Sequence, residues 1–406
     1  MVVSELDEIA WLFNLRGEGE SHNEGLFHTP TFQSLSLVTG GEVILWVHMD
    51  KVNQEVRDHL ENVEIRDIEN SLRDLTEWIS MHPEADKILI TKPSSYLSGS
   101  SYAVYSAIPE TISNLDNSPL INMKAVKNPS EVAGMVEAHI LDAVAVCDWA
   151  GYMEMQIMVD KVDNWTEISA ADLLSQYRLQ QEGCKGDSFG TISAYGANGA
   201  IIHYSPTNDT DARISRDSLY MVDSGGQYLG GTTDITRTFH YGSPTDDQIL
   251  RYTEVLQGAI ELARLVVPDN TLDSSVDLAT RQFLFQHGLD YLHGTGHGIG
   301  AYLEVHEGPI LVRMRNTNPG RLQAGQFFSD EPGYYQEGDW GLRLESILQV
   351  VPATFEHNQY GNFIKFEAVT LVPFEPKLIN FSLMSPEQID WYNVYNQIIR
   401  DKVGPR

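Results

Sequence analysis

The stretch DSGGQYLGGTTDITRT, residues 223–238, carries two acids eleven positions apart, Asp223 and Asp234, among glycine and hydroxyl residues. The apolar run LYMVD, residues 219–223, predicts a buried strand that ends in an acid. Burying that charge is costly unless a cation or hydrogen bonds compensate it. Eleven positions allow a strand, a turn and a returning strand, so we expect the two acids to face each other from the arms of a hairpin.

Three further segments concentrate acids and histidines among small residues: HGTGHGIGAYLEVHEGP (293–309), SDEPGYY (329–335) and GLRLES (341–346). In the last of these, the period of two in a strand places Arg343 and Glu345 on one face and leucines on the other. Four carboxylates and one imidazole, without a thiolate, form an oxygen-rich set that suits a pair of divalent ions. Two such ions, roughly 3.5 to 4 Å apart, lower the pKa of a shared water and generate hydroxide near neutral pH. The five residues of this set are Asp223, Asp234, His297, Glu331 and Glu345.

Two competing motifs lack the context that their chemistry needs. The segment GDSFG (186–190) fits G-x-S-x-G and would make Ser188 a nucleophile, but a polar helical stretch precedes it where a buried strand is required. The segment GHGIGA (296–301) fits a loose dinucleotide fingerprint, yet no helical pattern follows it. We therefore expect neither a serine hydrolase nor a dinucleotide-binding loop.

The composition of the chain limits its size class and its partners. At 406 residues it is long enough for two domains. Its net charge of −30 repels phosphate backbones, so we expect no nucleic-acid partner. No apolar run is long enough to span a bilayer, so we expect no transmembrane segment. The start of the chain lacks the regions of a signal peptide, which favours a cytoplasmic location and leaves a secreted or surface form open.

The order of apolar and polar runs predicts two domains. Residues 1–121 alternate short apolar runs with helical stretches, which indicates a small α/β domain, and a loop rich in Ser, Asn and Pro (109–119) leads to the second domain, 122–406. There, Asn128, Pro129 and Glu131 predict a capped helix. Its expected buried face holds Val132, Val136, Ile140, Val144 and Cys147. Further helices are expected over 167–182, 244–267, 272–287 and 385–403, and strands over 199–205, 219–225 and 342–351.

Segments along nearly the whole chain resemble aminopeptidase P, the Xaa-Pro aminopeptidases of the pita-bread metallopeptidase family. The resemblance implies a creatinase-like α/β domain followed by an α+β pita-bread catalytic domain. Three-domain members carry another domain before the first matching segment, so we expect a short form or a fragment that lacks it. The matching segments are LDEIAWLFNLRG (6–17), KAVKN (124–128), NGAIIHYSP (198–206), VDSGGQY (222–228), GTTDITRT (231–238), LDYLHGTGHGIG (289–300), VHEGP (305–309), DEPGYY (330–335), LRLES (342–346) and LVPFEPKLI (371–379).

The resemblance also implies roles for single residues. It makes Asp223, Asp234, His297, Glu331 and Glu345 the ligands of two divalent metal ions, for which we expect Mn²⁺, with Zn²⁺ or Co²⁺ as alternatives. His203, His293 and His306 would be supporting histidines, and Arg343, which precedes the last ligand, would support the site. Glu331 would take the proton of the attacking water, and His293 and His306 would position substrate and transfer protons with near-neutral pKa values.

The implied reaction is release of the N-terminal residue from peptides with proline at the second position. A homodimer is expected from the family. Two alternatives stay open: a sister enzyme with the same ligands, which is a prolidase-type dipeptidase or a methionine aminopeptidase, and a catalytically silent pita-bread module that binds peptides or proteins.

Overall fold

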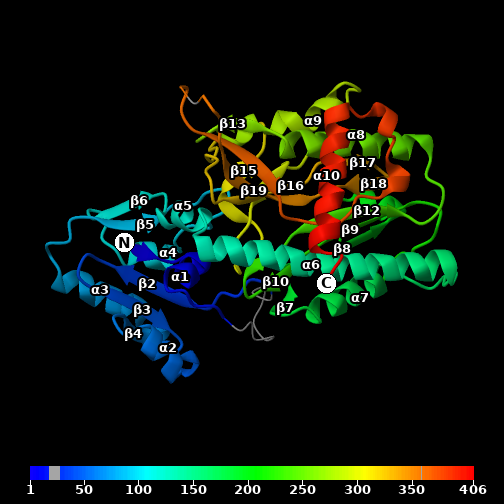
Figure 1. Ribbon diagram of the computed structural model, residues 1–406. Coiled ribbons are helices and arrows are strands. Elements are labelled where there is room, and N and C mark those ends of the chain that lie inside the picture. The colour runs from blue at the N-terminus through cyan, green and yellow to red at the C-terminus, as the bar shows by residue number, and fades with distance from the viewer. Residues whose placement is uncertain (18–27, 358) are drawn as a thin grey trace. The chain divides into compact units, whose positions relative to one another are not determined.

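The computed structural model describes residues 1–17, 28–357 and 359–406. It divides into two compact units, Met1–Lys124 and Ala125–Arg406, which we describe separately (Figure 1). The division falls within helix α5 (Leu120–Ala125).

The first unit is a six-stranded mixed sheet in the order β4-β3-β2-β1-β5-β6 with helices on both faces. Alternate residues of its central strands point to opposite faces, so Ile44 and Trp46 enter one apolar core while Leu45 and Val47 enter the other. Helix α3 adds to the first core and α1 to the second. The elements are β1 (Val2–Val3), α1 (Leu6–Leu12), β2 (Ser34–Val38), β3 (Val43–Val47), α2 (Gln54–His59), β4 (Glu64–Asp67), α3 (Ser71–Met81), β5 (Ile88–Thr91), α4 (Tyr102–Ser106) and β6 (Ser113–Asp116).

The second unit combines helices with four antiparallel sheets, whose strand orders are β12-β9-β8, β11-β10-β7, β13-β20-β19-β16-β14-β15 and β17-β18. Its helices are α6 (Pro129–Glu154), α7 (Glu167–Leu179), α8 (Asp246–Ala263), α9 (Asp277–Phe285) and α10 (Pro386–Lys402). Its strands are β7 (Cys184–Asp187), β8 (Ile192–Tyr195), β9 (Leu219–Ser224), β10 (Gly226–Tyr228), β11 (Gly231–Thr232), β12 (Ile235–His240), β13 (Val266–Pro268), β14 (Gly296–Gly298), β15 (Glu307–Val312), β16 (Phe327–Asp330), β17 (Gly333–Gln336), β18 (Trp340–Arg343), β19 (Ser346–Ala353) and β20 (Phe363–Ala368).

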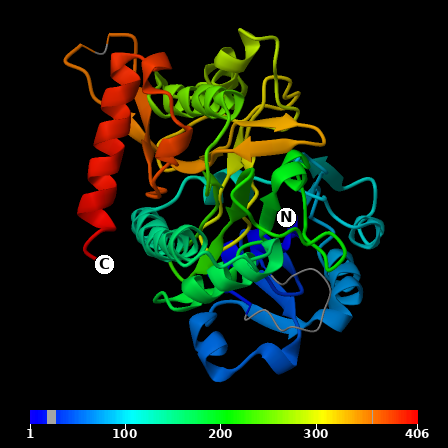
Figure 2. The same cartoon turned by 90° about the vertical axis from the view of Figure 1, so that its right-hand side faces the viewer.

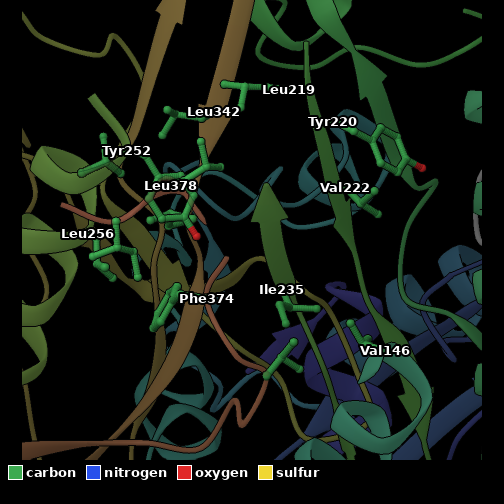
Figure 3. Close-up of a cluster of buried hydrophobic side chains, with 14 of the residues drawn as sticks. Val146, Leu219, Tyr220, Val222, Ile235, Tyr252, Leu256, Leu342, Phe374 and Leu378 are labelled. Carbon is green, nitrogen blue, oxygen red and sulfur yellow. The ribbon is translucent and has the colours of Figure 1, made fainter. Parts of the chain in front are cut away.

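The main core of the second unit packs behind strands β9 and β12 (Figure 3). Val222 and Ile235 enter it from these strands, and Tyr252 and Leu256 enter it from α8. Because side chains alternate along a strand, burial of Val222 on this side turns Asp223 to the opposite side. The core thereby determines which face of the sheet carries the acids.

Helix α6 begins as the sequence predicts, but its buried face differs from the prediction. The side chain of Asn128 accepts hydrogen bonds from the first turn and Glu131 completes the capping box. Val132 and Val136, however, are only half-buried. The most buried face instead carries Met135, Ala138, His139, Asp142, Val146, Trp149 and Met153. The sequence pattern misses this face because two of its members are polar. Asp142 is compensated by Arg178 from α7, and His139 Nδ1 bonds to the carbonyl of Met135 one turn earlier in α6 itself.

Three other expectations need correction. The strand predicted over 199–205 is absent, and these residues form a 3₁₀ turn, η4 (Gly196–Ala200), followed by further turns. The helix predicted over 272–287 is split, because a short 3₁₀ segment (Asp273–Ser275) precedes α9. Helix α8 starts at Asp246 rather than at residue 244, because Thr245 and Gln248 form its capping box.

The C-terminal helix has the extent that its sequence predicts. Ser385 caps α10, Pro386 takes its first position and Gln388 completes the capping box. The helix lies at the surface of the second unit in both views, drawn in red (Figures 1 and 2). Among the described residues, no helix combines the length and the apolar character that a membrane crossing requires.

Candidate metal centre

Strands β9 and β12 place the two acids of the opening stretch close together. The strands pair antiparallel as predicted, but Asp223 lies opposite Thr236 rather than Asp234. The intervening residues form a second small hairpin, β10 and β11, which shifts the register relative to a simple turn. Asp234 lies two positions before Thr236, so their side chains share one face and Asp234 approaches Asp223 diagonally.

Two further acids come from the ends of other strands. Glu331 follows β16, and its backbone N–H donates to the carbonyl of Thr295 at 2.8 Å. Glu345 lies between β18 and β19, and its backbone N–H donates to the carbonyl of Thr236 at 3.0 Å. This last bond ties the loop of Glu345 directly to the strand that follows Asp234.

His297 occupies the centre of the short strand β14. The residue before it, Gly296, has no room for a side chain, because the backbone of β16 lies against it. A Cβ atom built at Gly296 would lie 1.7 Å from the carbonyl oxygen of Ser329. The glycine therefore allows β14 to approach β16 closely. The Ser329 hydroxyl accepts the backbone N–H of His297 at 3.0 Å and donates to Glu331 Oε1 at 3.3 Å, which couples these two residues.

The structure brings all five predicted metal ligands together. In three overlapping groups, the potential ligand atoms lie within 4.8 Å of one another. His297 Nε2 is 3.5 Å from Asp234 Oδ2 and 3.5 Å from Glu331 Oε1. The groups are Asp223, Asp234 and Glu345; His297, Glu331 and Glu345; and Asp234, His297 and His306. His306 thus lies as near as the predicted ligands, although the resemblance gives it only a supporting role.

Burial and mutual repulsion determine the protonation of the cluster. Burial, followed by the charge of Asp223, raises the pKa of Asp234 well above its usual value. Burial and then Asp234 raise the pKa of Glu345 in the same way. Burial also raises the pKa of Glu331 to about 8. The carboxylates therefore repel one another in a buried site, and bound cations would relieve this repulsion.

Two observations show that this donor set fits divalent ions. Asp223 Oδ1 and Asp234 Oδ1 are buried, and the described part of the chain offers neither atom a hydrogen-bond partner. His297 Nδ1 lies 3.0 Å from the carbonyl oxygen of Gly298, which can only accept, so Nδ1 carries the proton. The lone pair of Nε2 then faces carboxylate oxygens, an arrangement that is repulsive without a cation between them.

Hydrogen bonds from neighbouring residues orient two of the five predicted ligands, Asp223 and Glu345. Arg343 Nη2 donates to Asp223 Oδ2 at 2.5 Å, and Arg343 Nη1 donates to the Tyr335 hydroxyl at 2.8 Å. The Thr236 hydroxyl donates to Glu345 Oε2 at 2.8 Å. The sequence reasoning missed Tyr335 and Thr236, although each lies in a segment already singled out, and Thr236 shares the strand face of Asp234.

His293 is held differently from the expectation. Its Nε2 lies 2.8 Å from the Tyr335 hydroxyl and its Nδ1 lies 2.7 Å from the carbonyl oxygen of Gly294. Burial, followed by the charge of Arg343, lowers the pKa of His293 to about 3. The near-neutral pKa expected for this residue is therefore wrong, and the ring is neutral at pH 7.

The other two supporting histidines are exposed and lie near the cluster. The His306 ring packs edge-on against the His297 ring, with centroids 4.1 Å apart. His203 lies in the turns after η4. Burial and the charge of Arg343 are the larger causes of the lowered pKa of His293, and the charge of His203 lowers it further. Burial is likewise the largest cause of the lowered pKa of His306, and the charge of His203 also lowers that pKa. The structure thus brings the three histidines within electrostatic range of one another.

Ser188, the competing nucleophile, has a structural role. Its side chain is buried and its hydroxyl donates to the carbonyl of Thr233 at 2.8 Å. This bond supports the turn that precedes Asp234.

Comparisons with known proteins agree with this geometry. Residues 133–352 match the model of metallopeptidase family M24, residues 1–131 match a creatinase/prolidase N-terminal domain, and residues 362–406 match the C-terminal region of peptidase M24. The chain is 42% identical to Xaa-Pro aminopeptidase 1 of Dictyostelium discoideum, covering 100% of this chain and 62% of the relative. It is 41% identical to Xaa-Pro aminopeptidase 2 of Sus scrofa, covering 100% of this chain and 58% of the relative. The chain thus spans about three-fifths of the length of these curated relatives.

Solved structures extend the likeness to the fold. An X-prolyl aminopeptidase of Caenorhabditis elegans, described as a cytosolic enzyme with a di-nuclear active site, matches 100% of this chain and 64% of its own length, with a TM-score of 0.90 and 33% identity. An Xaa-Pro dipeptidase of Bacillus anthracis matches 92% of this chain and 93% of its own, with a TM-score of 0.67 and 22% identity, which shows the shared fold alone. The chain therefore belongs to metallopeptidase family M24, with a creatinase/prolidase N-terminal domain followed by the pita-bread fold that its sequence resemblance predicts.

Proposed function

We propose that this chain is an aminopeptidase with two divalent metal ions that releases the N-terminal residue from peptides with proline at the second position. The observation that carries the proposal is the cluster of Asp223, Asp234, His297, Glu331 and Glu345, with its buried and unpartnered carboxylate oxygens. The names of the relatives, Xaa-Pro aminopeptidases at about 40% identity, support the substrate class.

These five residues would hold the ions. Four carboxylates and one imidazole suit Mn²⁺, and they also accept Zn²⁺ or Co²⁺. When bound, the ions supply a nucleophile derived from water at neutral pH and polarise the peptide carbonyl. Asp223 keeps one oxygen for Arg343 and has the other free for an ion, so that the arginine orients the ligand.

Glu331 is the proposed general base. Its Oε1 accepts the hydroxyl hydrogen of Ser329 at 3.3 Å, which restrains the rotation of the carboxylate. A restrained carboxylate at the edge of the cluster can take the proton of the attacking water and return it to the leaving proline nitrogen.

The hydrogen-bond pattern divides the tasks among the histidines. Arg343 can only donate, so the Tyr335 oxygen accepts from it, and the Tyr335 proton points to His293 Nε2. His293 therefore positions Tyr335 and has no proton on Nε2 to give. His306, exposed beside His297, is the proposed donor to the developing oxyanion.

The decisive experiment compares three substrates with the metal-stripped protein before and after addition of Mn²⁺ or Zn²⁺. The substrates are a tripeptide with proline second, the same tripeptide with alanine second, and an Xaa-Pro dipeptide. We expect metal-dependent release of the first residue from the proline tripeptide only. Cleavage of the dipeptide alone would favour the prolidase alternative, and no cleavage by folded, metal-loaded protein would favour a silent binding module.

A variant connects the activity to the cluster. Asp234→Asn keeps the shape of the side chain but removes a charge, and we expect loss of bound metal together with loss of turnover. Normal hydrolysis by this variant would contradict the assignment of the ligands. The homodimer and the cytoplasmic location remain predictions, which sedimentation and fractionation test.

A further inference from the structure

The first residue of α7, Glu167, is completely buried and accepts hydrogen bonds from four residues. All of these donors are neutral, and they lie at the end of β8 and in the loop that leads from it to β9. Their distances to the Glu167 oxygens are 2.6 Å from the Tyr195 N–H, 3.0 Å and 3.2 Å from Asn198 Nδ2, 2.8 Å from the Tyr204 hydroxyl and 2.9 Å from the Ala212 N–H. One buried carboxylate thus connects the beginning, the middle and the end of the segment 195–212.

This segment carries His203. Tyr204, one position later, is buried and its hydroxyl is held by Glu167, whereas His203 itself is exposed. Because consecutive side chains leave the backbone in different directions, anchoring Tyr204 inward turns His203 outward, toward the other supporting histidines. Residues 199–205, which do not form the predicted strand, lie between the anchored residues Asn198 and Ala212 and include Tyr204.

The segment also contacts the strand that carries Arg343. A Cβ atom built at Gly341 would lie 2.0 Å from the carbonyl oxygen of Gly199, so the two backbones are in close contact. Two residues later, Arg343 Nη1 points to the carbonyl oxygen of Ile202 at 3.5 Å. The segment therefore lies directly beside the strand that carries Arg343.

We propose that Glu167 is a positioning residue for the peptidase reaction: it holds the segment 195–212 in the one conformation that presents His203 to the substrate beside His293 and His306. The inference rests on the proposed function, because His203 has a task only if the cluster hydrolyses peptides. Glu167 itself touches neither the predicted ligands nor the substrate and acts through the segment.

The test is Glu167→Gln, alone and combined with His203→Ala. Glutamine keeps the shape, but its amide group can accept at one oxygen only and directs N–H groups at donors that need an acceptor. We expect faster hydrogen exchange across 195–212, unchanged metal stoichiometry, and a loss of about tenfold to a hundredfold in kcat/KM on the proline tripeptide. In the His203→Ala background, the additional loss from Glu167→Gln should largely vanish.

Two further variants keep the test decisive if Glu167→Gln fails to fold. Tyr204→Phe removes the 2.8 Å bond to Glu167 together with the bonds of the same hydroxyl to Asn198 Nδ2 at 2.9 Å and to the Thr210 carbonyl at 3.0 Å. All of these bonds hold the segment 195–212, so this variant should give the same pattern, more weakly. Tyr252→Phe is the matched control, because Tyr252 is buried in the same unit and its hydroxyl accepts the Glu375 N–H at 2.9 Å, far along the chain from the segment. The control should change neither exchange across 195–212 nor kcat/KM.

The outcomes separate the two proposals. Unchanged exchange across 195–212 in both variants, or losses from Glu167→Gln and His203→Ala that multiply independently, would overturn the positioning role. A wild-type protein that binds metal but cleaves no peptide would overturn the proposed function, while the exchange measurement would still report whether Glu167 holds the segment.

Discussion

The buried ion pair of Arg178 and Asp142 allows a stability prediction to be worked from the structure. Arg178 Nε donates to Asp142 Oδ1 at 2.8 Å and Nη2 donates to Asp142 Oδ2 at 3.3 Å, and the arginine is fully buried. Nη2 also donates to the Ser224 hydroxyl at 3.0 Å, next to Asp223. Arg178→Met keeps an unbranched apolar chain of similar length and leaves Asp142 with the 3.0 Å bond from the Tyr228 hydroxyl.

Removing one partner of a buried pair costs about 3 to 5 kcal/mol, because the other charge stays buried and uncompensated. For a unit of this size, that loss corresponds to a decrease of roughly 6 to 20 °C in Tm. Thermal unfolding followed by circular dichroism measures the loss, and hydrogen exchange of the α6 amides assigns it to the second unit. The control is Arg213→Met, since Arg213 pairs with Asp163 at 2.7 Å on the surface and should cost about 0 to 1 kcal/mol.

The pairing itself is tested by a double-mutant cycle. The variant Arg178→Met/Asp142→Leu removes both charges, so it should be less destabilised than the sum of the single variants, with a coupling of about 1 to 3 kcal/mol. A loss below about 1 kcal/mol for Arg178→Met, or strictly additive losses, would refute the reasoning that this pair compensates two buried charges.

Three further outcomes follow from the metal centre. Thr236→Val removes the 2.8 Å bond to Glu345 Oε2, so we expect metal affinity to fall about tenfold to a hundredfold in a chelator competition. An unchanged affinity would contradict an orienting role of Thr236. Burial raises the pKa of Glu331 from 4.5 to about 8, so the folded state binds more protons than the unfolded state, and chelator-treated protein should lose stability as the pH rises from 4.5 toward 8. Urea midpoints at three pH values measure this trend, which added Mn²⁺ should reverse. Gly296→Ala would place a Cβ atom 1.7 Å from the Ser329 carbonyl oxygen, so we expect a lower Tm and fewer bound metal ions per chain. A variant with the Tm and the metal stoichiometry of the wild type would contradict the close approach of β14 to β16.

Local signals in the sequence predicted many elements of the second unit well. The capping residues of α6 and α10 and the apolar run of β9 are short-range signals, because each involves only residues a few positions apart. The starts of these helices and the position of this strand can therefore be predicted without knowledge of the rest of the chain. The residue types of the five predicted ligands are equally visible, because acids at the ends of buried strands need compensation whatever the fold.

Other features were decided by contacts between segments far apart in the chain. The register that places Asp223 opposite Thr236 depends on the additional hairpin between the two strands. The pKa of His293 depends on burial and on Arg343, fifty positions later, and neither can be judged from the surroundings of His293 in the chain. The charge of Asp142 on the buried face of α6 is compensated by Arg178, which comes from α7.

The sequence by itself determined the residue types of the cluster, the family of the chain and the positions of the capped helices, since these rest on residue identity and on short-range hydrogen bonds. Only the tertiary structure decided that residues 199–205 are a loop rather than a strand, and that the Tyr204 hydroxyl bonds to the buried Glu167. The physical reason is that an apolar run satisfies the period of a strand equally well in either case. The carboxylate of Glu167 lies more than thirty positions before Tyr204, accepts its hydroxyl, and also accepts the backbone N–H groups of Tyr195 and Ala212 on either side of these residues, which no local pattern reveals.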